Sequence, residues 1–282
     1  PISHNRISKL VPPEEKNGYL EQDFRLFHIK DQTKREFSYH YHDFHKVIVF
    51  LSGKAAYHIE GKSYYLKPWD ILLVNRHAIH KPEIDFSVPY ERFVLWIRDD
   101  IAATDLLRCF QKAIDRSFNL IRLDSGTQEK LKQLLYELEA ALKDKKFGSD
   151  LLGTALFTQF MVYVNRIFLE KQYIYDTHSY SSDSQVEELL RYINHNLTED
   201  LSIETLARKY YLSKYHMMRK FKDETGYTIH NYIINKRLLL ARTKIAEGIP
   251  VLKAAQLSGF SDYTTFSRAY KKQFGAAPSQ TI

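Results

Sequence analysis

Three of the 12 histidines in the chain lie within six residues, at His40, His42 and His45, and His80 follows in a later segment. A neutral imidazole can ligate a metal ion, and it can also donate and accept hydrogen bonds at a polar ligand. Residues two apart on a strand project to the same face, so His40 and His42 would point to one side together. Three interpretations follow: a metal site, the polar lining of a small-molecule pocket, or ordinary structural histidines. We expect His40, His42 and His80 to line a pocket.

Aromatic side chains are a second group that could bind a ligand, and they make up 14% of the chain. Tyr57 and Trp96 lie on segments rich in β-forming residues. A flat aromatic face suits a sugar or an aromatic compound, although most such residues belong to a hydrophobic core. We place Tyr57 and Trp96 with the three histidines as candidate effector-binding residues.

Basic residues gather near the carboxyl terminus, while the whole chain carries a formal charge of +7. From Arg208 to Lys272 there are 14 basic and 4 acidic residues, a net charge of +10, so the other 217 residues sum to −3. A positive field confined to one region indicates a phosphate backbone as the partner. The alternative is a set of solvated helix faces.

Length and composition exclude several classes of protein. The chain has 282 residues, of which 44% are hydrophobic and 27% charged, as in a globular protein of about two domains. The single cysteine, Cys109, cannot close an intramolecular disulfide or complete a thiolate metal site. No apolar run approaches the ~18 residues of a membrane span, and residues 1–17 lack the apolar core of a signal peptide. We expect a cytoplasmic protein with no membrane partner.

The first hundred residues have the pattern of short β-strands separated by turns. Many short strands at such spacing indicate a sandwich or a barrel. The expected strands are Phe24–Lys30, Phe37–His42, Lys46–Ser52, Ala55–Glu60, Ser63–Leu66, Ile71–Asn75 and Tyr90–Ile97.

The hydrophobic period then changes to that of helices. Ser125-Gly126-Thr127-Gln128 fits a capping box, and an amphipathic helix follows it. Its apolar stripe is Leu131, Leu134, Leu138 and Leu142. The stripe predicts a homodimer interface, with packing on the chain's own barrel as the alternative.

A second, more uniformly apolar helix is expected at Ser149–Lys171. The polar, aperiodic residues 176–184 are the expected linker between domains.

The carboxyl-terminal part repeats itself at a period of 48 to 49 residues. Arg219-Lys220-Phe221-Lys222 recurs as Arg268-Ala269-Tyr270-Lys271, and each run is followed by a glycine. Each copy predicts a short helix, a tight turn ending in Ser213 or Ser261 as N-cap, and a second helix that ends at glycine. This is the pattern of a helix-turn-helix.

The second helix of each copy has a polar outer face suited to the major groove of DNA, where arginine can bind guanine through two hydrogen bonds. An uninterrupted helix from Thr228 to about Glu247 should separate the copies by ~30 Å, close to one turn of B-DNA. The candidate DNA-binding residues are Lys214, Tyr215, Met218, Arg219, Lys222, Tyr263, Thr264, Ser267, Arg268 and Lys271.

Residues from about Leu201 to Ser279 resemble the AraC family of bacterial transcription regulators. The resemblance rests on Leu212-Ser213, Arg219-Lys220-Phe221-Lys222, Asn235-Lys236-Arg237-Leu238 with Ala241, Gly259-Phe260-Ser261-Asp262, Phe266-Ser267-Arg268-Ala269-Tyr270-Lys271 and Gly275-Ala276-Ala277-Pro278-Ser279. It implies that the two second helices enter successive major grooves of double-stranded DNA. It also implies a homodimer, a small-molecule effector, RNA polymerase as a partner, and activation of transcription.

The histidine segment, followed by Gly53, resembles the first motif of a cupin barrel. Metal-binding cupins place a carboxylate shortly after the two histidines, and this chain has Lys46 there. The second motif also departs from the cupin pattern, because Pro68-Trp69-Asp70 lacks the glycine between proline and aspartate. We therefore expect no metal, no cofactor and no catalytic residue.

Together these observations predict an α+β multidomain protein. Residues 1–175 form a cupin-like barrel with following helices, residues 176–184 a linker, and residues 185–282 an all-α domain with two helix-turn-helix units. The predicted function is a DNA-binding transcription regulator, an activator that responds to a small molecule such as a sugar. The alternatives are a metal-dependent cupin enzyme fused to a DNA-binding module and a regulator controlled by protein partners alone.

Overall fold

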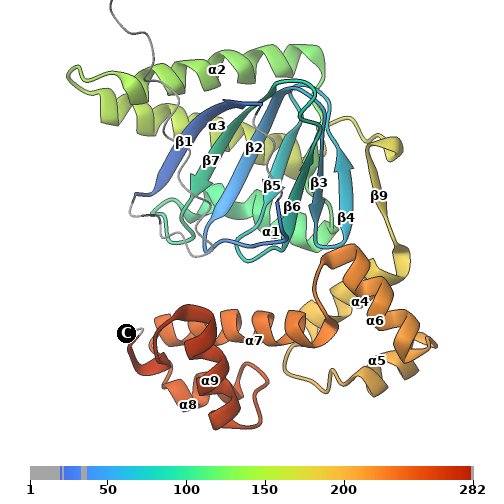
Figure 1. The fold of residues 1–282 in the computed structure, drawn as a ribbon. Coiled ribbons are helices and arrows are strands. Elements are labelled where there is room, and N and C mark those ends of the chain that lie inside the picture. The colour runs from blue at the N-terminus through green and yellow to red at the C-terminus, as the bar shows by residue number, and fades with distance from the viewer. Residues whose placement is uncertain (1–19, 21, 33–36, 281–282) are drawn as a thin grey trace, which may run out of the picture.

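The computed structural model describes residue 20, residues 22–32 and residues 37–280. A β-barrel with its helices forms one domain, and a helical domain lies against one end of that barrel (Figure 1). The predicted architecture is confirmed: an α+β multidomain chain with a cupin-like barrel followed by an all-α domain with two helix-turn-helix units.

Two antiparallel sheets face each other across the barrel. The strand order is β1-β7-β2-β5-β8 in the first sheet and β6-β3-β4-β9 in the second. The strands are β1 (Phe24–Asp31), β2 (His45–Ser52), β3 (Ala55–Ile59), β4 (Lys62–Tyr65), β5 (Ile71–Val74), β6 (His80–Ile84), β7 (Tyr90–Ile97), β8 (Leu120–Ile121) and β9 (Tyr180–Ser182).

The expected strand Phe37–His42 is wrong. Within it only His40 pairs, in an isolated bridge to His80. Strand β6 was not predicted, because its sequence contains Pro82 and charged residues and lacks a clear strand pattern; it pairs with β3. Residues 39–43 contact the helical domain. Tyr39 and Tyr41 are aromatic because they pack at this interface, and aromatic residues at alternate positions also give the sequence the pattern of a strand.

Strand register determines which side chains enter the barrel. Lys46 of β2 pairs with Trp96 of β7 on one side and with Val74 of β5 on the other. Paired residues of antiparallel strands point to the same face. Lys46 and Trp96 therefore share the inner face.

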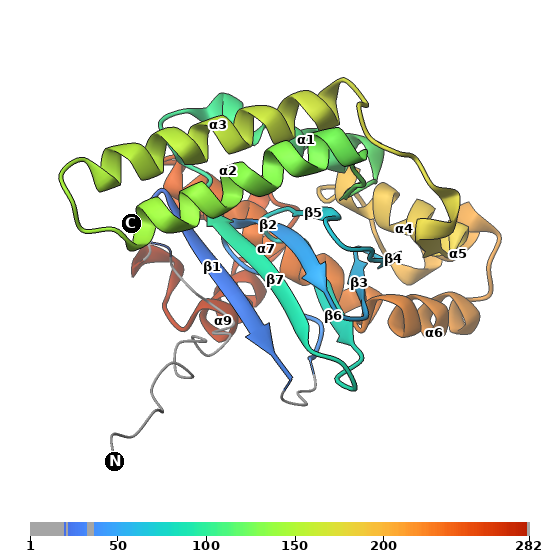
Figure 2. The same ribbon diagram turned by 90° about the horizontal axis from the view of Figure 1, so that it is seen from above.

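Helices cover the outer face of the first sheet (Figure 2). They are η1 (Thr104–Leu107), α1 (Arg108–Arg116), α2 (Ser125–Lys143) and α3 (Ser149–Leu169). Phe157 of α3 stacks on Phe24 of β1 with ring centroids 4.0 Å apart.

The predicted N-cap of α2 at Ser125 is wrong by one residue. The Asp124 carboxylate instead accepts hydrogen bonds from the free N–H groups of Gly126 and Thr127. Aspartate is as effective an N-cap as serine.

The leucine stripe of α2 is not a free dimer face. Leu131, Leu134 and Leu138 are buried in the hydrophobic core of their own domain, and Leu142 alone of the four is exposed. The alternative of packing on the chain's own barrel therefore describes this helix. Burial of three leucines contributes several kcal/mol to the stability of the domain, at ~1.5–3 kcal/mol each.

Helix α3 has the 21-residue length and apolar composition of a membrane span. Its apolar side chains, including Phe160, Met161 and Val164, lie in the same hydrophobic core as the barrel strands. Packing of these side chains against α2 and the barrel accounts for the apolar residues of its inner face.

The segment between the domains has regular structure. It holds η2 (Thr177–Ser179) and β9, which extends the second sheet next to β4. Arg122 bonds Asp176 at 2.8 Å, Asp70 at 2.6 and 2.9 Å, and the hydroxyl of Ser179. These side-chain bonds and the pairing of β9 with β4 hold residues 176–182 against the barrel.

The helical domain contains two helix-turn-helix units joined by a long helix. The elements are α4 (Ser184–His195), α5 (Ile203–Tyr210), α6 (Lys214–Thr225), α7 (Ile229–Ala246), α8 (Val251–Gln256), α9 (Tyr263–Phe274) and η3 (Pro278–Gln280). Ser213 caps α6 as predicted, and Gly226 and Gly275 end α6 and α9 in the left-handed conformation. Asp262, not Ser261, caps α9 through Thr265 N–H at 2.6 Å, because the turn of the second unit carries the extra residue.

Two hydrophobic cores stabilise this domain. One joins α4 to α6 and the first part of α7, and includes Tyr41 and Ile79 from the barrel domain. The other joins the end of α7 to α8 and α9 and includes Ala254, which is fully buried. The first core thus extends across the domain boundary.

Candidate functional site

The second helix of each unit presents a polar outer face to solvent. In α6, Met217 and Phe221 point into the core, while Tyr215 is 72% and Met218 40% exposed. The remaining candidates on this helix, Lys214, Arg219 and Lys222, are exposed as well. The repeat in the sequence therefore gave the inner and outer faces of α6 correctly.

Helix α9 repeats this arrangement. Phe266 and Tyr270 are buried, whereas Tyr263, Thr264, Arg268 and Lys271 are exposed and Ser267 is half-buried. Each helix has 12 residues, and Arg219 and Arg268 occupy the same position in their helices, the sixth.

The two arginines are available for a ligand. Among the described residues neither Arg219 nor Arg268 takes part in a hydrogen bond or an ion pair. Lys214 differs, because its ammonium pairs with Glu204 of α5. An exposed guanidinium without an internal partner can bind phosphate or a base edge without first losing a contact.

Inside the barrel, four of the five candidate effector residues come together. Ring centroids lie 4.4 Å apart for His40 and His80, 5.3 Å for His42 and His80, and 6.4 Å for His42 and Trp96. His45 points to the other face of β2, where its ring nitrogens bond Asp99 and the backbone N–H of Arg76.

Tyr57, the fifth candidate, belongs to a neighbouring group in the barrel. Its hydroxyl lies 3.0 Å from the hydroxyl of Tyr90. The Arg92 guanidinium lies 4.2 Å above the Tyr90 ring and pairs with Asp31 at 3.1 Å. Arg92 and Asp31 are not among the residues expected from the sequence, because their proximity depends on the pairing of β1 with β7.

Lys46 is the side chain that most changes the chemistry of the histidine cluster. It is buried, and its Nζ lies 2.6 Å from His42 Nε2. Burial, and then the positive charge of Lys46, lower the pKa of His42 to about 2. The same two causes hold the pKa of His80 well below its usual range. Both imidazoles are thus neutral at physiological pH.

Polar atoms of this cluster are left for a ligand. His42 Nδ1, His80 Nε2 and Trp96 Nε1 are buried without a hydrogen-bond partner among the described residues. His80 Nδ1 faces the Ala78 carbonyl at 2.9 Å, so its Nε2 is a free acceptor, and Trp96 Nε1–H is a free donor. A buried polar atom without a partner costs ~1–3 kcal/mol, which a ligand hydrogen bond would recover.

The three histidines also meet the spatial condition for a metal site, since their candidate ligand atoms lie within 4.8 Å of one another. Lys46 opposes that use, because its ammonium would donate to His42 and repel a divalent cation. This donor set fits a neutral or anionic organic molecule better than a metal ion.

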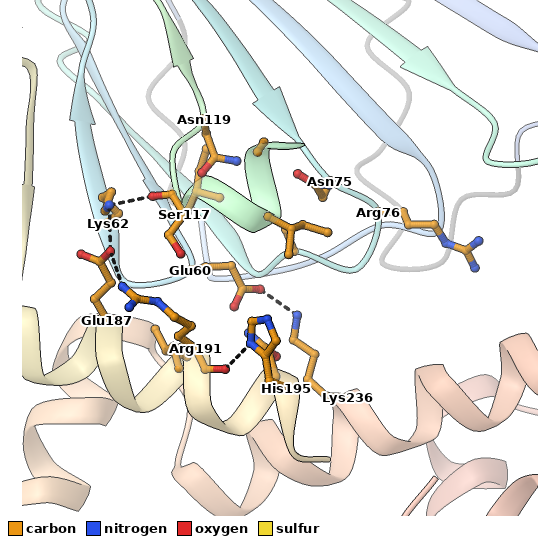
Figure 3. A pocket seen from close by; sticks show the side chains of 16 residues that line it. Glu60, Lys62, Asn75, Arg76, Ser117, Asn119, Glu187, Arg191, His195 and Lys236 are labelled. Carbon is orange, nitrogen blue, oxygen red and sulfur yellow. Dashed lines mark hydrogen bonds and ion pairs between the residues drawn. The ribbon is translucent and has the colours of Figure 1, made fainter. Parts of the chain in front are cut away.

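A cavity of about 270 Å³ lies between the barrel and the helical domain (Figure 3). Ion pairs from the two domains meet at its wall: Lys62 with Glu187 at 3.1 Å, and Glu60 with Lys236 at 2.8 Å. The charged groups at the wall therefore already pair with one another across the boundary.

The fold defines a class of protein: a cupin-like barrel joined to a helical domain with two helix-turn-helix units. An AraC-like ligand binding domain matches residues 26–161, and a helix-turn-helix domain matches residues 206–282. The chain belongs to the AraC family of transcription regulators.

Curated relatives agree with this assignment. The chain is 25% identical to the probable transcriptional regulator LumQ of Photobacterium leiognathi over 244 residues, 86% of this chain and 91% of LumQ. It is 23% identical to the HTH-type transcriptional activator RhaR of Mannheimia succiniciproducens over 246 residues, 86% of each chain. It is 34% identical to the probable transcription factor PqrA of Proteus vulgaris over 102 residues, 35% of this chain and 84% of PqrA.

Proposed function

We propose that this protein is a sequence-specific transcription activator in which both helix-turn-helix units read one DNA duplex. The observation that carries the proposal is the equivalent, exposed placement of Arg219 and Arg268 on α6 and α9. The activator names of several relatives, RhaR among them, support activation over repression. Activation requires RNA polymerase as a further partner and a cytoplasmic location.

The test begins with duplexes selected from random DNA by the full-length protein. If Arg219 and Arg268 read bases, each arginine-to-alanine change should weaken binding to the selected duplex by ~1–3 kcal/mol and relax specificity at one position. Lys253→Ala, an exposed position on α8 outside both second helices, is the matched control for lost charge.

A phosphate-binding role gives a different result. Affinity for selected and random DNA would then fall by the same factor. The slope of the logarithm of the affinity against the logarithm of the salt concentration would decrease in magnitude by about one. That outcome would contradict base reading by the arginine concerned.

The barrel interior is the proposed effector site. The free acceptor at His80 and the free donor at Trp96, beside the Lys46 ammonium, suit a polyhydroxylated molecule such as a sugar or a sugar acid. The Trp96 ring can also pack against the C–H face of a sugar. Binding to the folded protein should stabilise it by RT ln(1 + L/Kd), where L is the free ligand concentration, so its melting temperature should rise with ligand concentration.

A panel of sugars and sugar acids, measured by thermal shift and calorimetry, tests this site. Trp96→Phe and His80→Ala should abolish the shift produced by any ligand found, while His230→Ala, an exposed change on α7, should leave it intact. A ligand whose affinity survives both interior changes binds elsewhere, and the barrel interior is then not its site.

The proposed assembly is a homodimer. Exposed apolar side chains gather at the end of the α2–α3 hairpin: Phe147 is fully exposed, Leu151 77% and Leu152 53%. Neighbouring exposed apolar side chains of this kind mark an interaction surface. These residues replace the buried leucine stripe as the candidate contact.

A further inference from the structure

Residues 39–43 lie between the barrel interior and the helical domain and contact both. His40 and His42 face the inside of the barrel, where their rings meet His80. The backbone of His40 exchanges two hydrogen bonds with His80, at 3.0 and 2.9 Å. The inner residues of this segment are thus part of the proposed effector site.

The alternate residues, Tyr39, Tyr41 and Asp43, contact the helical domain. The Asp43 carboxylate also bonds Arg76 and His77 of the barrel domain, at 3.2 and 2.7 Å. The Tyr39 hydroxyl donates to the Glu224 carbonyl at the end of α6, at 2.9 Å. Its ring packs so closely on Gly226 that a Cβ there would lie 2.2 Å from the ring. Tyr39 therefore holds the first helix-turn-helix unit.

The other two residues hold the second unit and the helix between the units. Tyr41 bonds Gln273 of α9 through its hydroxyl. The Asp43 carboxylate pairs with Arg242 of α7 at 3.2 Å. A segment of five residues therefore contacts both units and their connecting helix.

These contacts leave the outer faces of α6 and α9 open. Glu224, Gly226 and Gln273 lie toward the C-terminal ends of these helices, whereas Arg219 and Arg268 stay exposed. The segment therefore contacts both units and does not cover their candidate DNA-binding surfaces.

We propose that residues 39–43 couple occupancy of the barrel to the spacing of the two helix-turn-helix units. A ligand that displaces His40 or His42 moves the neighbouring residues that hold α6, α7 and α9, since they share one short stretch of backbone. This inference rests on the proposed effector site and adds the residues through which its occupancy reaches the DNA-binding domain.

The experiment measures spacing discrimination, the ratio of Kd for a duplex with one inserted base pair to Kd for the duplex selected by the wild-type protein. His42→Ala perturbs the inner side of the segment. His42→Gln, which keeps an acceptor for Lys46, replaces it if the alanine variant does not fold. Tyr39→Phe, Tyr41→Phe and Asp43→Ala combined remove the side-chain hydrogen bonds and the ion pair that this segment makes with the helical domain.

If the segment couples the two sides, the inner change should alter spacing discrimination by about threefold or more in the wild-type background. The same inner change should have no further effect once the outer contacts are removed. Tyr64→Phe, which removes the hydrogen bond of the buried Tyr64 side chain to Asn119 in the barrel, is the matched control and should leave the ratio unchanged.

Equal effects of the inner change in both backgrounds would overturn the proposal, and so would no effect of a folded inner variant. Failure of the wild-type protein to select any duplex would instead overturn the proposed function, and this inference with it. A selected duplex with additive effects leaves the DNA-binding function standing and rejects the coupling alone.

Discussion

At the scale of single residues, burial of neutral histidines predicts a pH-dependent stability. An unfolded histidine titrates near pH 6.5, whereas burial and Lys46 lower the pKa of His42 in the folded chain to about 2. Between these values the unfolded chain binds a proton that the folded chain does not. The free energy of unfolding should therefore fall on acidification below pH 6.5, by about 1.4 kcal/mol per pH unit for this group.

Urea unfolding of the wild-type protein and His42→Gln at several pH values between 7.5 and 5 measures this slope. The variant should show a shallower dependence, and the exposed substitution His230→Gln should retain the wild-type slope. His80 contributes in the same direction, because its pKa is also lowered by burial. Identical slopes for wild type and His42→Gln would show that the pKa of His42 in the folded state is not lowered.

The histidine cluster shows what residue types and spacing can reveal. His40, His42 and His80 were predicted to converge, and Trp96 joins them in the structure. The placement of Tyr57 beside Tyr90 depends on strand register. The contacts of Tyr39, Tyr41 and Asp43 depend on how two domains dock, and no local pattern in the sequence encodes that geometry.

At the scale of elements, the two glycines that end α6 and α9 form a matched pair. Gly226 and Gly275 have φ of +73° and +77°, so alanine at either position incurs ~1–2 kcal/mol of left-handed strain. A Cβ at Gly275 has nothing within 4 Å, while one at Gly226 would lie 2.2 Å from the Tyr39 ring. Gly226→Ala should therefore destabilise the protein more than Gly275→Ala.

Chemical unfolding gives the two costs, and hydrogen exchange at residues 39–43 locates the difference. Exchange there should rise in Gly226→Ala and stay at the wild-type level in Gly275→Ala. Adding Tyr39→Ala to Gly226→Ala should remove the excess cost. Equal costs for the two glycine variants would mean that Tyr39 does not pack against α6 in solution.

The α2–α3 hairpin supplies a second contrast between elements. Leu134 is buried in the core, so Leu134→Glu should unfold the domain, because an unpaired charge would be buried there. Leu151→Glu with Leu152→Glu should leave the fold intact and convert a dimer into a monomer. Sedimentation or light scattering with circular dichroism separates these effects. A dimer that persists in the folded double variant would place the interface elsewhere.

Helix boundaries were predictable where caps and periodicity agree. The bounds of α5 and the glycine ends of α6 and α9 followed from the repeat. The N-caps of α2 and α9 were each misplaced by one residue, because an aspartate stands next to the expected serine at both sites. The two-residue β8 and the polar β9 lack a period of their own and form through pairing with β5 and β4.

At the scale of the whole molecule, the distance between the two units sets a geometric condition on DNA. Helix α7 has 18 residues and is ~27 Å long, which with its flanking turns approaches the ~34 Å of one helical turn of B-DNA. The domain interface adds to this constraint, because residues of the barrel hold α6, α7 and α9 together.

Insertion of five base pairs between the two contacts should therefore abolish simultaneous binding, because it rotates the second site by about half a turn to the opposite face of the duplex. Affinity should fall to that of one unit, and Arg268→Ala should then have no further effect on the inserted duplex. Insertion of ten base pairs restores the face but adds ~34 Å, which a rigid pair of units cannot span, so affinity should stay low. Recovery at ten base pairs would show that the units move freely relative to each other. Affinity that survives both the five-base-pair insertion and the loss of Arg268 would show that the second unit does not read DNA.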